Sequence, residues 1–144
     1  MVDGDTFILP PGDYRTTSVI QVGDSSGYIH FREYNFDGRI KPEGCSGITF
    51  ERLHSCTVNV NCVQRATFDW GVGNYWGVKF KNVNYSKMYV NSSLYFTYGL
   101  YFDGDVKGVC YNNITFERIT AKYCLHFKAQ NGGWINANNY YGGQ

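Results

Sequence analysis

Gly47-Ile48-Thr49-Phe50-Glu51-Arg52-Leu53 is one of three versions of the same phrase in this chain. The others are Gly77-Val78-Lys79-Phe80-Lys81-Asn82-Val83 and Asn113-Ile114-Thr115-Phe116-Glu117-Arg118-Ile119, with a looser copy in Tyr28-Ile29-His30-Phe31-Arg32-Glu33-Tyr34. In each clear copy, Ile or Val and Phe alternate with polar residues, which predicts a β-strand with one buried face. A strand that recurs without helical patterns between its copies predicts a coil, in which each strand pairs with its equivalent one turn later.

Two further apolar segments follow each clear copy at similar distances. They are marked by Val58 and Phe68, by Met88 and Phe96, and by Leu125 and Trp134. Aromatic residues make up 18% of the chain and glycine is frequent, which favours strands and turns. We therefore predict an all-β protein: a right-handed, single-stranded parallel β-helix with about three short strands per turn, about four to five turns and no capping helix.

The polar residue after each phenylalanine alternates in charge from one copy to the next. These residues are Arg32, Glu51, Lys81 and Glu117. Equivalent residues of neighbouring parallel strands lie ~4.8 Å apart, so opposite charges there are mildly stabilising. We therefore expect Glu51 and Glu117 to belong to a structural charge ladder rather than to a catalytic pair.

Charge and composition exclude several classes of function. The net charge is +1, and no basic patch is visible that would bind a nucleic acid backbone. No stretch is apolar and long enough to span a bilayer, and no secretion leader is visible at the start. The five cysteines include no CxxC pair and the three histidines are scattered, which predicts free thiols and no metal site.

A family resemblance rests on the two ends of the chain. The opening, Asp5-Thr6-Phe7-Ile8-Leu9-Pro10-Pro11-Gly12-Asp13-Tyr14 followed by Thr16-Thr17-Ser18-Val19-Ile20, resembles the entry strand of the pectate-lyase-like right-handed β-helix superfamily. The ending, Gly132-Gly133-Trp134-Ile135-Asn136-Ala137-Asn138 with Tyr140-Tyr141-Gly142-Gly143, is similar to a pattern in β-helical tailspikes and tail fibres of bacteriophages and prophages. One fold of this kind carries many functions, so the resemblance is more specific for fold than for activity.

The resemblance implies a carbohydrate partner and a virion or extracellular location. Family members include polysaccharide lyases, polygalacturonases, epimerases and tailspikes that bind or cut surface glycans. Arg39-Ile40-Lys41 matches one element of the polygalacturonase motif set, but the elements that should precede it are missing. Residues 1–144 are expected to form a single β-helix domain, as a fragment of, or a module within, a longer β-helical protein. Uncovered coil ends favour self-association, either as a homotrimer, which the resemblance implies, or by end-to-end stacking.

Four aspartates outside the charge ladder are candidates for catalysis: Asp37, Asp69, Asp103 and Asp105. Hydrolysis of a glycan needs two carboxylates, ~5–5.5 Å or ~6.5–9.5 Å apart, whereas a lyase needs a base and often calcium. Asp103-Gly104-Asp105 has the residue types either for a calcium ligand pair, the one cofactor considered, or for a plain turn. No coherent catalytic motif is visible, so we expect this chain alone not to be an enzyme.

A glycine-rich loop provides the candidate sugar-binding surface. Its residues Trp70, Asn74, Tyr75 and Trp76, together with Tyr101, offer flat apolar faces and hydrogen-bonding groups. An equally weighted alternative is that the tryptophans fold inward or pack on a neighbouring subunit. Three functions therefore stay open: a carbohydrate-binding tail module, a fragment of a polysaccharide lyase or glycoside hydrolase, and a purely structural, self-associating β-solenoid.

Overall fold

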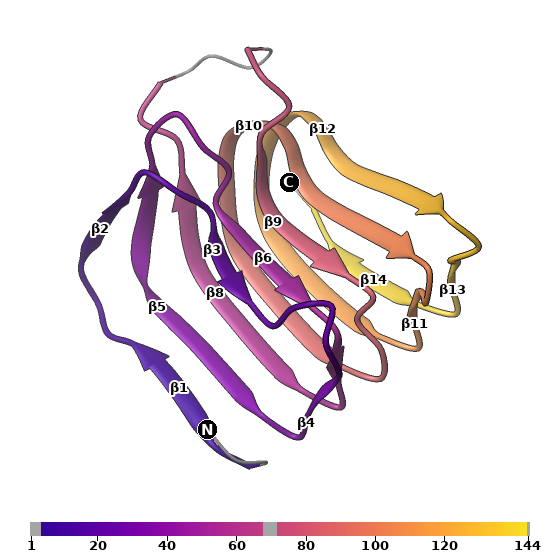
Figure 1. Ribbon diagram of the computed structural model, residues 1–144. Coiled ribbons are helices and arrows are strands. Elements are labelled where there is room, and N and C mark those ends of the chain that lie inside the picture. Colours follow the sequence, from indigo (N-terminus) through magenta and orange to yellow (C-terminus); the bar gives the residue numbers. More distant parts are fainter. Residues whose placement is uncertain (1–3, 68–71, 144) are drawn as a thin grey trace.

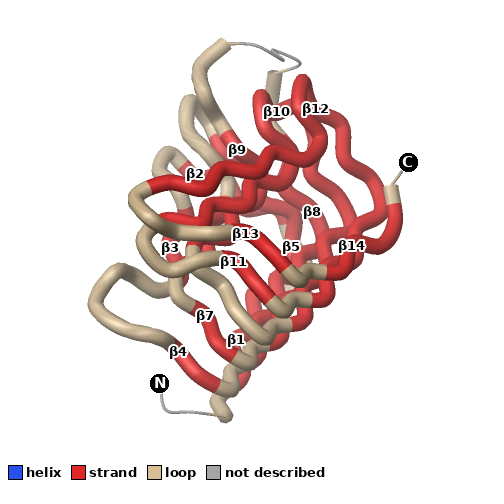
Figure 2. The backbone as a smooth tube through the Cα atoms, turned by 90° about the vertical axis from the view of Figure 1, so that its right-hand side faces the viewer, coloured by secondary structure: helices blue, strands red, loops and turns tan. Residues whose placement is uncertain are grey.

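A computed structural model describes residues 4–67 and 72–143 of the chain as a parallel β-solenoid of about five turns (Figure 1). All the regular elements in these two ranges are β-strands, and every pairing between them is parallel. Seen from the side, the turns lie over one another as successive layers (Figure 2). The prediction of an all-β parallel β-helix is therefore confirmed.

Strands of successive turns form three faces. The first face contains β1 (Thr6–Leu9), the first parts of β5 (Glu33–Pro42), β8 (Thr57–Gln64), β10 (Lys87–Asp105) and β12 (Asn113–Gln130), and β14 (Asn139–Gly142). The second contains β2 (Asp13–Thr16) and the later parts of β5 and β8, with the middle parts of β10 and β12. The third contains β3 (Ile20–Val22), β6 (Ile48–Glu51), β9 (Trp76–Lys81) and the last parts of β10 and β12.

A row of short strands joins the third face to the first. It contains β4 (Ile29–His30), β7 (Leu53–His54), β11 (Val109–Cys110) and β13 (Ile135–Asn136). Asn84 bridges the row between His54 and Cys110. This row closes each turn of the coil, so the equivalent residues of successive turns stay in register.

A stack of phenylalanines fills the core behind the third face. Phe50, Phe80, Phe102 and Phe127 follow one another with ring centroids 5.6, 5.7 and 5.1 Å apart and planes within 21° of parallel. The first three rings are fully buried, whereas Phe127 in the last described turn is 45% exposed. Repeated burial of one ring per turn holds neighbouring turns together.

The third copy of the phrase is not in register with the first two. Phe50 pairs with Phe80, as predicted, but Phe80 then pairs with Phe102, and Phe102 with Phe127. Phe116 instead pairs with Val90 in the first face. An alternating apolar pattern suits any strand with one buried side, so the same phrase occurs in two different faces.

The charge ladder exists, but with different members. In register order it contains Glu51, Lys81, Asp103 and Lys128, and the Lys81 Nζ lies 3.1 Å from a Glu51 carboxylate oxygen. Glu117 lies in the first face, where it accepts a 2.5 Å hydrogen bond from the Tyr89 hydroxyl. The structural role is thus confirmed for Glu51, and the placement of Glu117 in the ladder was wrong.

One corner of the coil repeats the same backbone conformation in every turn. Phe31, Ser55, Tyr85, Tyr111 and Ala137 follow one another at this corner, all with left-handed φ values between 51° and 58°. We call these five residues the corner column. Such a conformation turns the chain sharply between the short-strand row and the first face.

Buried asparagines support the same corner from inside. The Asn112 amide nitrogen donates to the Val83 carbonyl at 2.7 Å, and the Asn112 side-chain oxygen accepts from the Ser86 backbone N–H at 2.9 Å. One turn later Asn138 repeats this pattern with the Asn112 N–H and the Val109 carbonyl. These bonds satisfy backbone groups that the bend removes from the strand ladders, and asparagine suits such bends because it tolerates left-handed backbone.

The remaining sequence-based expectations concern thiols and the membrane. All five cysteines are free, as predicted. Cys56 and Cys110 are buried at the short-strand row, where their sulfurs contact backbone or side-chain oxygens. Within the described ranges, no helix has the length and apolarity needed to cross a membrane.

Candidate functional site

Trp76 and Tyr101, two of the predicted binding residues, lie next to each other on the outside of the third face. Their strands β9 and β10 pair there, and the two rings are edge to face with centroids 6.0 Å apart. The Trp76 indole N–H donates to the Thr49 hydroxyl at 3.1 Å, which fixes the orientation of the ring. Two residues of the predicted binding surface therefore lie side by side, and their role in binding stays a prediction.

Three more rings extend this pair across the next turn. Tyr98 lies 5.4 Å from Tyr101 and 4.4 Å from His126, and it stacks on Tyr123 at 5.6 Å. Tyr123 is 47% exposed, whereas Tyr101 is buried beneath its neighbours and only 9% exposed. We call Trp76, Tyr98, Tyr101, Tyr123 and His126 the aromatic face.

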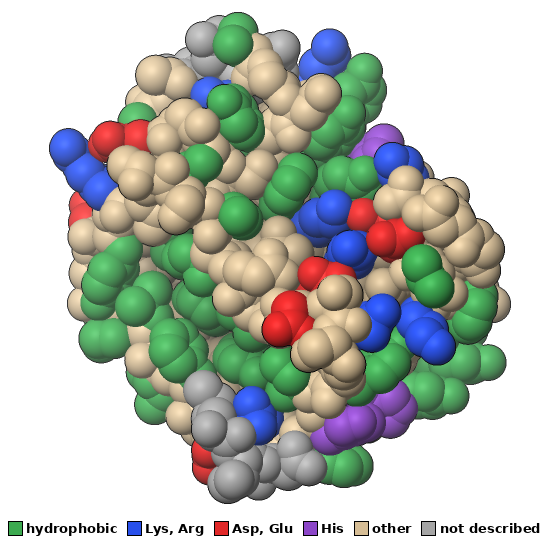
Figure 3. Space-filling model, viewed as in Figure 1, with side chains coloured by type: hydrophobic (Ala, Val, Ile, Leu, Met, Phe, Trp, Pro, Cys, Tyr) green, Lys and Arg blue, Asp and Glu red, His purple; other side chains and the backbone are tan. Residues whose placement is uncertain are grey.

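Lys79 lies at the centre of the aromatic face. Its ammonium nitrogen is 4.8 Å from the Trp76 ring centroid and 4.6 Å from that of Tyr101, in the range of cation–π contacts. The same nitrogen lies 2.7 Å from a carboxylate oxygen of Asp103, whose side chain is 2% exposed. The lysine thus connects the rings to a buried negative charge, and Figure 3 shows basic and acidic side chains gathered on this side of the molecule.

Asp103 and Asp105 lie at the end of β10 and not in the turn that their spacing suggested. Asp103 also accepts a 3.1 Å hydrogen bond from Gln130, and Asp105 lies 3.3 Å from Lys81. A hydrogen bond from Asn131, together with Lys81, lowers the pKa of Asp105. Lysine ammonium groups thus lie beside both carboxylates.

Metal binding has no visible centre in this region. Among the residues that the structure describes, no three His, Cys, Asp or Glu side chains gather in a metal-binding arrangement. Calcium binding by Asp103 and Asp105 would have to displace the ammonium groups of Lys79 and Lys81 from their present positions.

His126 adds a neutral ring to the aromatic face. Burial, helped by the positive charge of Lys128, lowers its pKa below the ordinary value, although Asp103 opposes this shift. This shift favours the neutral imidazole, which presents a flat polar ring beside Tyr98 and Tyr101. Sequence reasoning missed His126, Tyr123 and Lys79, because the register that places them beside Trp76 was not known.

The other predicted binding residues have different positions. Tyr75 is half-buried against the core, with the Arg65 guanidinium 4.8 Å from its ring centroid. Asn74 is exposed in the segment before β9. Trp70 and Asp69, a predicted binding residue and a catalytic candidate, lie outside the described residues.

Asp37, the remaining carboxylate candidate, lies on the opposite side of the coil in a polar area. It lines a shallow hollow of about 300 Å³ together with Asn59, Asn61 and Tyr89. The side-chain amides here form ladders between turns, including a 3.0 Å hydrogen bond from Asn91 to Asn61. These amides bond to each other, and this part of the surface has little aromatic area apart from Tyr89.

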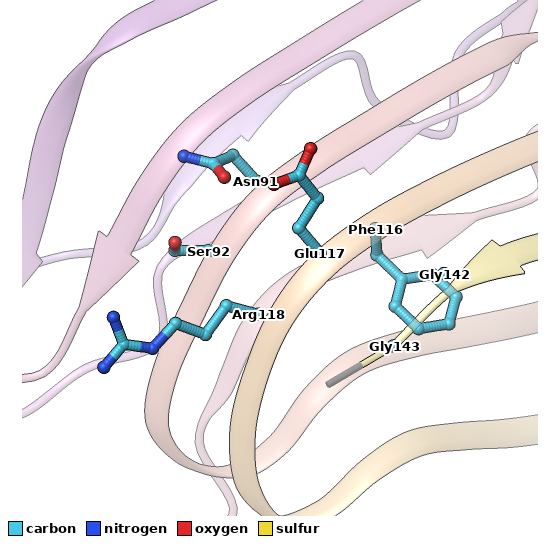
Figure 4. Close-up of a pocket in the computed structure, with 7 residues that line it drawn as sticks. All are labelled: Asn91, Ser92, Phe116, Glu117, Arg118, Gly142 and Gly143. Atoms are coloured by element: carbon cyan, nitrogen blue, oxygen red, sulfur yellow. The ribbon is translucent and has the colours of Figure 1, made fainter.

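A second hollow of about 510 Å³ adjoins this area and is drawn in Figure 4. Asn91, Ser92 and Arg118 project to one side of it, and the Phe116 ring lies on the other side, beside the end of β14. One carboxylate oxygen of Glu117 accepts a hydrogen bond from the Tyr89 hydroxyl. The hollow can accept hydrogen-bonding groups, but Phe116, at 8% exposed, offers no free ring face.

Comparison with known proteins adds no relative: no family model, curated protein or solved structure matches the chain. Of the surfaces that the structure describes, the aromatic face has the largest set of adjoining rings with a fixed cation among them. Ring faces of this kind pack against flat, weakly polar ligands, and the polar groups around them set orientation.

Proposed function

We propose that this protein binds carbohydrate through the aromatic face, as a recognition module of a β-helical phage or prophage tail protein. The observation that carries the proposal is the row of accessible rings, the partly exposed Trp76 and Tyr98 and the exposed Tyr123, which adjoin the buried Tyr101 and the fixed Lys79 ammonium. A sugar ring has an apolar face and a rim of hydroxyl groups, so aromatic faces and a fixed donor complement it. The tail assignment is supported only by the sequence resemblance at the two ends of the chain.

Binding without cleavage is favoured by the state of the nearby carboxylates. Asp103 is buried and paired with Lys79, and Asp105 is paired with Lys81 and Asn131. A general base must reach the substrate with a free oxygen, and a retaining or inverting pair must flank the scissile bond. These paired carboxylates instead support the positions of the lysines.

A glycan array followed by affinity measurements tests the proposal. Trp76→Ala should weaken binding of any captured glycan by about tenfold or more, because one aromatic contact of this size is lost. Trp134→Ala is the matched control, since Trp134 is the other tryptophan that the structure describes, is 47% exposed and lies outside β9, whereas Trp76 is half-buried. A folded Trp76→Ala variant that binds as well as the native protein would disprove the site. New reducing ends or unsaturated products would show that the protein is an enzyme.

A structural, self-associating role is the second candidate, and the ends of the coil favour it. At one end, an open hollow of about 320 Å³ is lined mainly by apolar side chains, among them Phe7, Ile20 and Val22. At the other, a hollow of about 300 Å³ is lined by residues that include Phe127 and Tyr140. Because all strands are parallel, the two ends present strand edges of the same direction, which suits head-to-tail contact between copies.

A further inference from the structure

The corner column contains bulky residues where the backbone favours glycine. Gly4 occupies the equivalent position one turn before Phe31 and has a φ of 88°. Phe31, Tyr85 and Tyr111 adopt left-handed φ values of 52–58° although their side chains make this conformation unfavourable. All three are more than half exposed, so burial in the core does not compensate for the strain. This combination of strain and exposure points to a role at the surface.

The side chains at this corner form a continuous series of contacting rings, of which Tyr85 and Tyr111 are stacked. His30 and His54 are 4.9 Å apart, His54 and Tyr85 are 5.0 Å apart, and Tyr85 and Tyr111 are 4.9 Å apart between ring centroids. The Tyr85 and Tyr111 planes differ by only 12°, so one ring covers the other face to face. We call His30, His54, Tyr85 and Tyr111 the corner ladder. Figure 3 shows histidine side chains at the lower edge of the molecule, over β4 and β7.

The rings of the corner ladder end at Tyr111, one turn before the last described turn of the coil. Ala137 follows Tyr111 in register, with the same left-handed backbone, but its side chain is a single methyl group. Tyr85 covers one face of the Tyr111 ring, and among the described residues no ring covers the other. Neighbouring turns are ~4.8 Å apart, so a ring in place of the Ala137 methyl group would lie at stacking distance from Tyr111. Asn136, which precedes Ala137 in the chain, is exposed.

We infer that Tyr111 and Ala137 form a second subsite, in which one pyranose ring stacks on the free face of Tyr111. The site offers one aromatic face, a small neighbouring residue and the exposed, hydrogen-bonding Asn136, a combination that matches the apolar face and hydroxyl rim of a sugar. This inference rests on the proposed function for its ligand class. It differs in place, because the corner ladder and the aromatic face lie at different parts of the coil.

Replacement of Ala137 by a residue with a ring, combined with sugar titrations, tests the inference directly. We would titrate isotopically labelled protein with the methyl glycosides of glucose, galactose, mannose and N-acetylglucosamine, and follow backbone amide shifts by NMR. At least one glycoside should shift the amides of Tyr111 and Ala137. Ala137→Tyr, which continues the ladder with a residue that this corner already accepts, should weaken that binding by about tenfold or more. Ala137→Ser, which copies the small residue at Ser55, should leave it within about twofold of the native value.

Two further variants separate this inference from the function proposed above. Trp76→Ala should leave the shifts at Tyr111 and Ala137 intact, even if it abolishes binding at the aromatic face. Tyr111→Ala should remove the shifts at the corner while the remaining amide spectrum stays native. The inference is wrong if no glycoside shifts these amides, or if the shifts persist in Ala137→Tyr. It is also wrong if sedimentation shows that Ala137→Tyr disperses an assembly, since a second copy would then fill the rung.

Discussion

At the residue scale, Lys79 is a largely buried cation at the centre of the candidate site. It contacts two rings of the aromatic face and is paired with Asp103, and the two charged side chains are only 14% and 2% exposed. A buried ion pair adds little net stability, but removal of one partner leaves the other charge without compensation.

Lys79→Met should therefore lower the free energy of unfolding by about 3 kcal/mol, because the Asp103 carboxylate stays buried. The double variant Lys79→Met with Asp103→Leu should recover most of this loss. Chemical denaturation of the two variants and the native protein measures both effects. A loss below about 0.5 kcal/mol in the single variant would mean that the pair behaves like an exposed one.

Two histidines make stability depend on pH. Burial, together with neighbouring His30, lowers the pKa of His54 below the ordinary value of 6.5, and burial with Lys128 does the same for His126. The unfolded chain therefore binds protons more readily than the native one. Their contribution is fully present above about pH 6.5 and is lost as the pH falls below it.

The midpoint of urea unfolding should accordingly decrease when the pH is lowered from 7.5 to 5.5. The decrease should be smaller in a variant that carries both His54→Asn and His126→Asn. Asp13, Asp24 and Asp105 have lowered pKa values through hydrogen bonds from Lys41, Ser26 and Asn131, respectively. They lose their contribution only below about pH 3.8, so they do not act in this window. A midpoint that rises on acidification to pH 5.5 would contradict the assignment.

At the scale of elements, the sequence predicted the strands better than their partners. The alternation in Ile48–Glu51 and in Asn113–Ile119 correctly indicated strands with a buried side. The same alternation could not show which face each strand joins, since that depends on the length of chain between corners. The aromatic face was accordingly predicted in part. Trp76 and Tyr101 lie on the directly paired strands β9 and β10, whereas His126 joins them only through the register of β10 with β12, and binding by these residues stays a prediction.

The corrected register predicts unequal effects for two phenylalanines that the sequence treats alike. Phe102 is fully buried inside the ring stack, so Phe102→Ala should cost about 3–5 kcal/mol of unfolding free energy. Phe116 is 8% exposed and lies under Gly142 and Gly143, near the end of the described coil, so Phe116→Ala should cost clearly less. Equal losses in denaturation experiments would argue for the register that the repeated phrase first suggested.

At the scale of the whole molecule, the two apolar ends predict concentration-dependent assembly. Val22→Lys at one end and Phe127→Lys at the other should each reduce association, because a head-to-tail contact needs both surfaces. Val106→Lys is a suitable control, since Val106 is an exposed valine outside both hollows. Sedimentation velocity distinguishes an open series of sizes from a closed trimer. Native protein that stays monomeric at high concentration would remove the second candidate function.

The unequal lengths of the turns have a consequence for how such a protein can change. Thirty residues separate Ile48 from its partner Val78, but only 22 separate Val78 from Leu100, and both pairs keep the register. The coil therefore does not fix how much chain runs between the strands. A change in the length of the chain between Gln64 and Trp76 should therefore leave the pairing of β6, β9 and β10 unchanged. The turns of such a coil can thus differ in length between the strands while the phenylalanine stack behind the third face stays in place.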